Sequence, residues 1–304
     1  MIIPRRISSI MISCGLALSL MNCSVRSNDV PGTEAILIDH RSAKLTSIPS
    51  TWIEQAKRSL HIAYGHSSHG SQLTTGMAGL AEWMGPLYSW NHGGTGGALD
   101  LKDYYYDFGG LGIANDLGTS ASWAPDRTAW ERATRAYLPL HPEINVIIWA
   151  WCWQANGTEA EIQLYLDLMN QLEIDYPGVK FVYMTGHVNG GPLTGDDYSA
   201  NLAKRNQQIR DYCIENAKTL YDFADIESWD PDGNFYGDKL VDDDCSYDSN
   251  GDGVRDRNWA IDWQNAHPGE WYSCEAAHTQ PLNANLKAFA AWWLWARLAG
   301  WGGR

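Results

Sequence analysis

Two short stretches near opposite ends of the chain carry the side chains best suited to chemistry. Residues 60–72 read Leu-His-Ile-Ala-Tyr-Gly-His-Ser-Ser-His-Gly-Ser-Gln, so a mostly apolar run ends at Gly65 in a turn of serines and histidines. α/β enzymes present a nucleophilic serine in this way, where a strand ends at the carboxyl edge of a sheet. The second stretch is Glu275-Ala-Ala-His278, which precedes a long apolar helix. Together the two stretches predict acyl transfer by a serine.

Acyl transfer by serine needs a base within hydrogen-bonding reach, a group that orients the base, and donors for the developing oxyanion. His278 is the candidate base and Glu275 the candidate orienting group. Two serines compete as the nucleophile, and the Gly-x-Ser spacing of residues 65–67 favours Ser67. The alternative interpretations are a Ser/Gly-rich loop at residues 65–71 and, at Glu275, a solvated charge beside a helix start.

These stretches resemble the SGNH/GDSL hydrolase superfamily, in which the nucleophilic serine follows the first strand and an Asp-x-x-His motif precedes the last helix. In this chain Gly-His-Ser stands where Gly-Asp-Ser is usual, and Glu275 replaces the aspartate. From about Ile38 to Trp301 the chain is more narrowly similar to a group of secreted bacterial proteins with a Gly-His-Thr-Ser-His-Gly-Ser-Gln block. That group often has threonine at the position of Ser67, so the resemblance favours Ser68 as the nucleophile.

The resemblance also implies a fold and an oxyanion hole. The expected fold is a three-layer α/β/α domain with a central parallel sheet, flavodoxin-like, over residues 37–304. In the superfamily the oxyanion hole consists of three donors: the backbone N–H of the nucleophile, a glycine N–H and an amide side chain. Gly110 is the candidate glycine. The Gly-x-Asn-Asp block that holds the amide is absent. Because Trp151-Cys-Trp-Gln154 stands in its place, Gln154 is the candidate amide donor.

Apolar runs and helix signals alternate through the second half of the chain. Strands are expected at residues 144–149, 179–184 and 220–224, with helices from Thr158 and Ser199. An earlier helix is expected at the capping box Thr51-x-x-Glu54. Such alternation predicts a parallel sheet covered on both faces. Residues 76–118, rich in Gly, Tyr and Trp, predict long loops with short helices.

Polar side chains gather where the predicted strands end. Because the carboxyl ends of parallel strands share one edge of the sheet, these residues predict a functional pocket there. Short polar residues also populate turns for conformational reasons, which is the alternative interpretation. With His278 as the base, His66 and His69 are expected to contact substrate or to support the turn. His187 and Asp225 are expected to bind substrate. The strand-end residues are His66, Ser67, Ser68, His69, Cys152, Gln154, Asn156, His187, Asn189, Asp222 and Asp225.

The N-terminus predicts export. Arg5 and Arg6 precede a short apolar stretch that ends in Leu20-Met-Asn-Cys23. Such a pattern predicts a secretory signal of residues 1–22, too short to span a membrane. The leucine three positions before Cys23 predicts a lipoprotein with lipid on Cys23, whereas the bulky Asn22 leaves cleavage and release open. We expect a location at the bacterial cell surface, in the periplasm or outside the cell, with residues 23–36 as a flexible linker.

The net charge and the aromatic content limit the classes of partner that we expect for this chain. The net charge of −14 becomes −16 when Arg5 and Arg6 leave with the signal. This acidity argues against nucleic acid and acidic membrane surfaces as partners. The sixteen Trp and fifteen Tyr suit sugar-stacking surfaces, although such rings serve cores equally well. We expect exposure, and for some of them a carbohydrate role, at Trp83, Trp90, Trp123 and Trp130.

The predicted function is hydrolysis of carbohydrate-linked esters, for example glycan deacetylation, through Ser68 and His278 without an organic cofactor. The substrate would be a poly- or oligosaccharide. A rival prediction is a glycosidase or lyase that uses, as acid and base, His66, His187, Asp225 or Glu275. A third is a glycan-binding lipoprotein without catalytic activity.

An acidic insertion at residues 242–262 predicts a calcium loop. Oxygen ligands at positions 1, 3, 5 and 9, a glycine at 6 and a backbone carbonyl at 7 are the spacing by which one tight loop wraps Ca²⁺. Trp259 stands where an EF-hand has its bidentate glutamate, so a distant ligand such as Asp242, Asp243 or Asp262 is expected. We expect a structural ion that braces the His278 loop, and the alternative is an acidic turn without an ion. The ligands in the loop would be Asp248, Asn250, Asp252, Val254 and Asp256.

The cysteines fit an exported protein, in which disulfides are permitted. A bond between Cys245 and Cys274 is expected to tie the acidic insertion to the His278 loop. Cys152 lies within the predicted site and is expected to be a buried thiol. No Cys/His spacing resembles a zinc motif.

Overall fold

A seven-stranded parallel sheet forms the centre of the structure, a computed structural model that describes residues 34–190 and 198–303. The expected signal sequence and Cys23 lie outside the described residues. The sheet has the order β1-β9-β8-β7-β2-β4-β3, and every neighbouring pair is parallel. Its strands are β1 (Ile36–Ile38), β2 (His61–His66), β3 (Trp90–Asn91), β4 (Leu99–Tyr105), β7 (Val146–Trp149), β8 (Lys180–Met184) and β9 (Thr219–Tyr221).

The order of the central strands indicates where on the sheet a ligand is expected to bind. From β2 the chain moves to β4 on one side, and from β7 it moves to β8 and β9 on the other. The five strands β4-β2-β7-β8-β9 therefore have the flavodoxin-like order 2-1-3-4-5. Open sheets of this kind bind ligands where the direction of winding reverses, outside the carboxyl ends of the strands. In this chain that point lies between β2 and β7.

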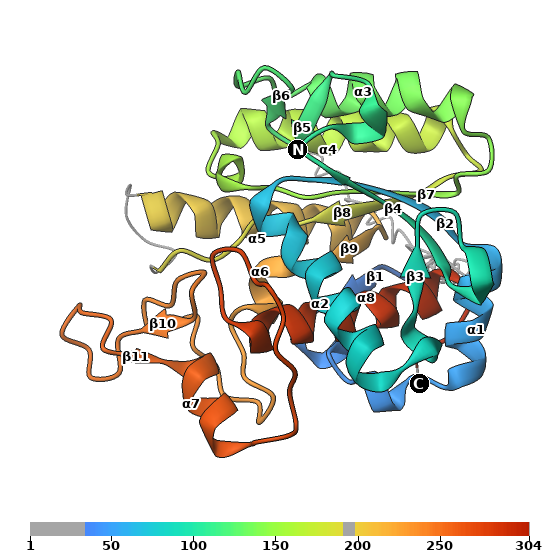
Figure 1. The fold of residues 1–304 in the computed structure, drawn as a ribbon. Helices are drawn as coiled ribbons and strands as arrows, with labels where there is room; N and C mark the ends of the chain where they lie inside the picture. The colour runs from blue at the N-terminus through green and yellow to red at the C-terminus, as the bar shows by residue number, and fades with distance from the viewer. Residues whose placement is uncertain (1–33, 191–197, 304) are drawn as a thin grey trace, which may run out of the picture. The chain divides into compact units, whose positions relative to one another are not determined.

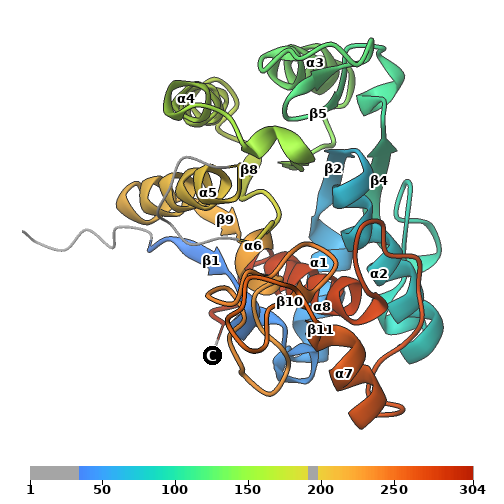
Figure 2. The ribbon, with the colours of Figure 1, turned by 90° about the vertical axis from the view of Figure 1, so that its left-hand side faces the viewer.

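Helices cover both faces of the sheet (Figures 1 and 2). Because strand side chains alternate between faces, Ile62 and Tyr64 enter one core and Ala63 enters the other. The first core packs against α1 (Ser50–Ser59), α2 (Ser68–Met84) and α8 (Pro281–Leu298). The second packs against α3 (Ala129–Tyr137), α4 (Glu159–Asp175) and α5 (Tyr198–Glu215). The predicted three-layer α/β/α fold is confirmed.

Smaller elements complete the described chain. The connection after β4 contains β5 (Ala114–Asp116) and β6 (Thr119–Ser120). The acidic insertion follows β9 and α6 (Phe223–Ile226), and in it β10 (Ser246–Tyr247) pairs with β11 (Arg257–Asn258) before α7 (Trp259–Ala266). No described helix has the length and apolar character needed to span a bilayer.

Local sequence signals predict some of these elements and miss others. The capping box of Thr158 and Glu161 at the start of α4 is confirmed. The capping box at Thr51 is wrong, because α1 begins at Ser50 after Pro49 and has no side-chain cap. The prediction of loops at residues 76–118 is also wrong, since α2 runs to Met84 and β4 is a strand of the central sheet.

Buried charges explain why β4 was missed. Asp100 and Lys102 lie within this strand and are buried, with the Lys102 ammonium 3.0 Å from the Asp100 carboxylate. Paired charges of this kind are tolerated inside a protein because each partner satisfies the other. A polar strand that is satisfied by its own charges does not have the apolar pattern of a buried strand.

The four described cysteines are all free thiols. The predicted Cys245–Cys274 disulfide is therefore wrong. The Cys245 sulfur lies 3.4 Å from the Thr279 hydroxyl, whereas the Cys274 sulfur lies 3.5 Å from the Asn285 amide. Burial raises the pKa of Cys245 above its ordinary value and that of Cys274 to about 11, so both remain protonated.

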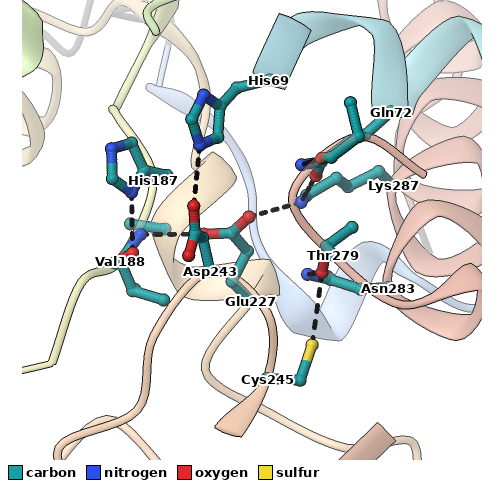
Figure 3. A network of polar contacts seen from close by, with 12 residues as sticks. His69, Gln72, His187, Val188, Glu227, Asp243, Cys245, Thr279, Asn283 and Lys287 are labelled. Atoms are coloured by element: carbon teal, nitrogen blue, oxygen red, sulfur yellow. Dashed lines mark hydrogen bonds and ion pairs between the residues drawn. The ribbon is translucent and has the colours of Figure 1, made fainter. Parts of the chain in front are cut away.

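A fully buried charged pair joins Lys287 of α8 to Glu227 at the end of α6, with Gln72 of α2 beside it (Figure 3). The Lys287 ammonium lies 2.6 Å from a carboxylate oxygen of Glu227 and also contacts the side-chain oxygen of Gln72. It lies 3.7 Å from the centre of the Phe223 ring, which adds a cation–π contact. Burial raises the pKa of Glu227 and lowers that of Lys287, and their mutual attraction opposes both shifts.

This buried pair also holds two loops at the carboxyl edge of the sheet. The second carboxylate oxygen of Glu227 accepts a hydrogen bond of 2.8 Å from the Val188 N–H, next to His187. The Gln72 amide donates a hydrogen bond of 2.5 Å to the Ala277 carbonyl, next to His278. The core pair therefore fixes the backbone beside two histidines of the predicted site.

We predict that Lys287→Met lowers the free energy of unfolding by about 3–5 kcal/mol, because it leaves the Glu227 carboxyl buried without its cation. Urea unfolding followed by circular dichroism measures this loss. Arg132→Met is the control, since it breaks an exposed pair with Asp126 and should cost less than about 1 kcal/mol. Adding Glu227→Gln to Lys287→Met should recover part of the loss. Equal costs for the two single variants would contradict the role given to the buried pair.

Candidate functional site

Ser68 and His278, 210 residues apart in the chain, meet at the carboxyl end of β2. Ser68 is the first residue of α2, and its hydroxyl lies 3.0 Å from Nε2 of His278. Ser68 is half-buried and His278 is exposed, so a substrate can reach both. A hydroxyl at this distance from an imidazole nitrogen is the nucleophile–base arrangement of serine hydrolases.

The backbone of His278 is in the left-handed region, with φ of 64°. A residue other than glycine is uncommon in this region, and such strain is concentrated at functional sites. The turn is held by the Gln72 hydrogen bond to Ala277 and by a 3.1 Å bond from the Thr279 N–H to the Ala276 carbonyl. The loop therefore presents the imidazole in one fixed position.

Ser67, the competing nucleophile, is committed to a different contact. Its buried hydroxyl donates a hydrogen bond of 2.6 Å to the carboxylate of Asp116. Burial raises the pKa of Asp116 despite the hydrogen bonds that this carboxyl accepts. Ser67 therefore ties β2 to the segment after β4, and Ser68 is the serine that faces a base.

Three imidazole rings are stacked in the order His187, His69, His278. The ring centres are 4.3 Å apart in both pairs, and the planes differ by 12° and 14°. Nε2 of His69 lies 2.9 Å from the Asp243 carboxylate, and Nδ1 lies 3.1 Å from the Cys152 sulfur. Burial lowers the pKa of His69 to about 4, although the hydrogen bond to Asp243 opposes this shift. His69 is therefore neutral at neutral pH.

Asp243, rather than Glu275, is the acidic group of the cluster. Nitrogen atoms of His69 and His278 and a carboxylate oxygen of Asp243 all lie within 4.8 Å of one another. Burial tends to raise the pKa of Asp243, but the hydrogen bond from His69 and the nearby imidazoles bring it below its ordinary value. The carboxylate therefore stays charged beside the base. Its place in the Asp242-Asp-Asp244 run of the insertion gave no indication of this role.

Glu275 does not occupy the orienting position that the resemblance implied. Its side chain is exposed, and within the described part of the chain no hydrogen bond joins it to His278. It lines a pocket of about 530 Å³ that also contains His66, Asp103 and Tyr105. His278, in the tight turn at residues 276–279, contacts Ser68, whereas Glu275 lines this other pocket, so a spacing of three does not pair the two side chains.

The two predicted oxyanion donors are engaged elsewhere. The Gly110 N–H donates to the Asp107 carbonyl at 3.2 Å. The Gln154 amide is buried, donates to the Thr119 hydroxyl at 2.5 Å and accepts a 3.2 Å hydrogen bond from the Cys152 N–H. The first turn of α2 offers other donors, because Ser67 precedes the helix without capping it. Backbone N–H groups at a helix start, reinforced by the helix dipole, stabilise negative charge.

His66 supports the turn of the nucleophile. It is buried, its Nε2 contacts the Asp103 carboxylate, and its Nδ1 lies 3.0 Å from the Ser67 carbonyl. His66 also lines the pocket that contains Glu275, at the side of α2. The structure thus places His66 beside the turn that carries Ser68, with both ring nitrogens already in contact with protein groups.

His187 and Asp225 line a second pocket, of about 560 Å³. Nδ1 of His187 donates to the Val188 carbonyl at 2.7 Å, whereas its buried Nε2 has no partner among the described residues. Asp225 accepts a 2.9 Å hydrogen bond from the His40 N–H and pairs with the His40 ring. Because His187 stacks on His69, this pocket adjoins the histidine cluster.

The four tryptophans that were expected at the surface differ in exposure. Trp123 is 57% and Trp83 42% exposed, and Trp90 is half-buried. The expectation for Trp130 is wrong, since this ring is fully buried against Trp149 and Tyr165. Trp123 packs against Tyr106, which in turn packs against Tyr105 at the end of β4, and the sequence did not predict these two tyrosine neighbours.

The described residues offer two clusters of His and Asp ligand atoms that could hold a metal ion. One is His69, Asp243 and His278, and the other is Asp39, His40 and Asp225. In the first cluster, Nε2 of His278 already contacts Ser68. A metal bound there would compete with the nucleophile for this imidazole.

The predicted calcium loop is a tight turn closed by β10 and β11. The Asp248 carboxylate accepts hydrogen bonds from the N–H groups of Gly253, Gly251 and Asn250, which lower its pKa. Gly253, at the predicted sixth position, has φ of 87°, where a side chain would be strained. The loop thus has the sharp turn and the charged first ligand that Ca²⁺ requires.

The suggested distant ligands of that loop are paired with other groups. Asp243 binds His69, Asp262 lies 2.9 Å from the Arg257 guanidinium, and Asp242 lies 3.4 Å from that of Arg255. A ligand shell for this loop would therefore consist of its own oxygen atoms and water.

Comparison of the chain with protein-family models and with curated proteins gives no match. The chemistry of the site therefore has to be inferred from its own side chains. They combine a serine at a helix start, a histidine base in contact with it, and a charged carboxylate close to that base.

Proposed function

We propose that the protein is an exported serine hydrolase that acts on carbohydrate-linked esters, for example in glycan deacetylation. The observation that carries this proposal is the 3.0 Å contact between the Ser68 hydroxyl and Nε2 of His278 at the start of α2. The position agrees with the site that a sheet of this winding order favours, at the carboxyl end of β2.

In the proposed mechanism, Nε2 of His278 takes the Ser68 hydroxyl proton while the oxygen attacks the ester carbonyl. The N–H groups of the first turn of α2 stabilise the oxyanion. His278, now an imidazolium, is stabilised by the nearby Asp243 carboxylate and returns its proton to the alcohol that leaves. Water then hydrolyses the acyl-serine by the same sequence of proton transfers.

The surroundings of Ser68 support a sugar as the alcohol part of the ester. Tyr105 is 49% exposed and lines the pocket with the carboxylates of Asp103 and Glu275. Aromatic rings bind the apolar faces of sugars, and carboxylates accept hydrogen bonds from their hydroxyl groups. The net charge of −14 favours a neutral or cationic glycan over an acidic one.

The pocket that contains Glu275 also supports a rival function, cleavage of a glycosidic bond. Glu275, Asp103 and His66 could act as acid and base on a glycosidic bond, as in a glycosidase or lyase. That enzyme would release oligosaccharides without any need for Ser68. A binding protein, the third alternative, would retain a glycan and release nothing.

We predict that a fluorophosphonate labels the protein and that Ser68→Ala abolishes the labelling. Both Ser68→Ala and His278→Ala should lower the hydrolysis of an acetylated glycan by about 10³-fold or more, because each removes one half of the nucleophile–base pair. Mass spectrometry identifies the labelled residue. Ser67→Ala is the control and should keep the label. No labelling, with oligosaccharides released from unmodified glycans, would favour the rival.

A second prediction separates the two acidic candidates. Asp243→Asn should lower kcat about 10²-fold with little change in KM, since it removes a charge that stabilises the imidazolium but does not touch the substrate. Glu275→Gln, the matched control, should leave kcat almost unchanged. Steady-state kinetics on an acetylated glycan distinguish them. The opposite result would restore Glu275 to the orienting role.

We also propose that the loop of residues 248–256 binds one structural Ca²⁺ ion. The support is the spacing of its oxygen ligands together with the turn at Gly253 and the charged Asp248. The ion would brace the insertion that carries Asp243, so it would act on the site only through stability.

Calcium should raise the melting temperature, and EDTA should reverse the rise. At a free Ca²⁺ concentration 100 times Kd the gain is about 2.7 kcal/mol. Asp252→Ala should remove the effect, whereas Asp238→Asn, an exposed acidic residue of the same region, should keep it. Calorimetry that detects no binding at millimolar Ca²⁺ would rule the site out.

A further inference from the structure

We propose that Cys152 is a second nucleophile beside Ser68 and a covalent modification site for small uncharged electrophiles, with His69 as its base and Asp243 as the group that positions His69. This inference does not depend on hydrolysis by Ser68. Cys152 follows β7 on the other side of the point where the winding of the sheet reverses. The two nucleophiles thus come from the two strands that flank this point.

The evidence is a continuous line of three side chains. The Cys152 sulfur lies 3.1 Å from Nδ1 of His69, and Nε2 of the same ring lies 2.9 Å from the Asp243 carboxylate. Nucleophile, base and orienting acid in this sequence are the parts of a cysteine triad. Cys152 is therefore part of a cluster with the geometry needed to remove its proton.

Asp243 fixes the tautomer of His69. A carboxylate only accepts hydrogen bonds, so Nε2 of the neutral ring must carry the hydrogen that binds Asp243. Nδ1 then has a free lone pair, and it faces the sulfur. The neutral state agrees with the lowered pKa of His69, which is about 4 as a result of burial. The neutral ring therefore has its free Nδ1 lone pair in contact with the thiol, in position to take the proton as the sulfur attacks.

The groups around His69 act on its pKa in opposite directions: burial and the two stacked imidazoles lower it, and the hydrogen bond to Asp243 raises it. His69 is faced by Asp243 and, above and below its ring, by His187 and His278. Tyr105, at the end of β4, also lies near Cys152: its hydrogen bond to Tyr106 raises the Tyr105 pKa, and Cys152 adds to this shift. The Asp243 carboxylate stabilises the imidazolium that forms when His69 accepts the proton.

Cys152 also differs from the other described cysteines in accessibility. It is half-buried, whereas Cys213 and Cys245 are buried and burial raises the pKa of both thiols. Cys274 is half-buried as well, but no histidine contacts its sulfur in the described structure, and its pKa is raised to about 11. Cys274 is therefore the matched control within the same chain.

The reaction with iodoacetamide is balanced within the site. The thiol proton moves to Nδ1 of His69, the sulfur forms a bond to the methylene carbon, and the carbon–iodine bond breaks to release iodide. The sulfur lies 3.5 Å from the Ser68 hydroxyl. A group attached to it would occupy the space where an ester approaches Ser68, so modification should also block the hydrolase.

The test is the rate of iodoacetamide alkylation of each cysteine in the full protein, measured by peptide mass spectrometry. Cys152 should react at least about tenfold faster than Cys274, because only Cys152 has a base. His69→Gln should lower the Cys152 rate about tenfold, whereas His141→Gln, at the opposite edge of the sheet, should not change it. Asp243→Asn should move the rate–pH profile of Cys152, a change that a merely structural role would not produce.

Continued protection of Cys213 and Cys245 shows that each variant is folded. An unchanged Cys152 rate in folded His69→Gln, or a wild-type rate no higher than that of Cys274, would overturn the proposal. Fluorophosphonate labelling is measured separately. A protein that alkylates rapidly at Cys152 but shows no serine labelling would retain this inference and lose the hydrolase.

Discussion

The arrangement of the candidate site depends on one buried ion pair. Lys287 and Glu227 are both fully buried, and a buried charge without its partner is among the most costly features that a core can contain. α8 must therefore bring Lys287 to Glu227, and α2 must bring Gln72 to the same ammonium. These two requirements fix the register of both helices against the sheet. Because Ser68 lies one turn before Gln72, the position of the nucleophile follows from the same pair.

Glu227 and Gln72 make further hydrogen bonds, which hold the backbone next to two of the three stacked histidines. Glu227 binds the backbone next to His187, and Gln72 binds the backbone next to His278. His69, between them in the stack, is on the same helix as Gln72. Three rings from three different segments are thus held parallel by one polar network in the core. These hydrogen bonds from the core explain how an exposed His278 can keep a strained backbone and a fixed distance to Ser68.

The sequence predicted the parts of the fold and of the site that follow from local signals. The strands that precede Cys152 and His187 are apolar runs, and the start of α4 is a capping box, so each could be read from a few neighbouring residues. The carboxyl edge of the sheet, and Ser68 with His278 on it, followed from strand ends and from a resemblance. β4 could not be recognised, because its charges are satisfied by a partner on the same strand.

The acidic partner of the base could not be predicted for a different reason. A spacing of three residues brings side chains together on a helix, but His278 lies in a left-handed turn that sends Glu275 toward another pocket. Asp243 enters the site from the acidic insertion, and nothing in its local sequence distinguishes it from Asp242 and Asp244. Likewise, the disulfide expected between Cys245 and Cys274 rested on location in the chain, whereas disulfide formation depends on the distance and direction of two side chains.

The position of Asp243 gives the site its chemical character. One carboxylate lies near two imidazoles, and each imidazole contacts a different proposed nucleophile, Ser68 or Cys152. A single negative charge can stabilise one imidazolium fully, and a second proton on the adjacent stacked ring would be repelled by the first. In the reactions proposed for Ser68 and Cys152, a proton on one imidazole would therefore make protonation of the other more difficult. Because His69 stacks on His278, the two proposed reactions would not proceed at the same time.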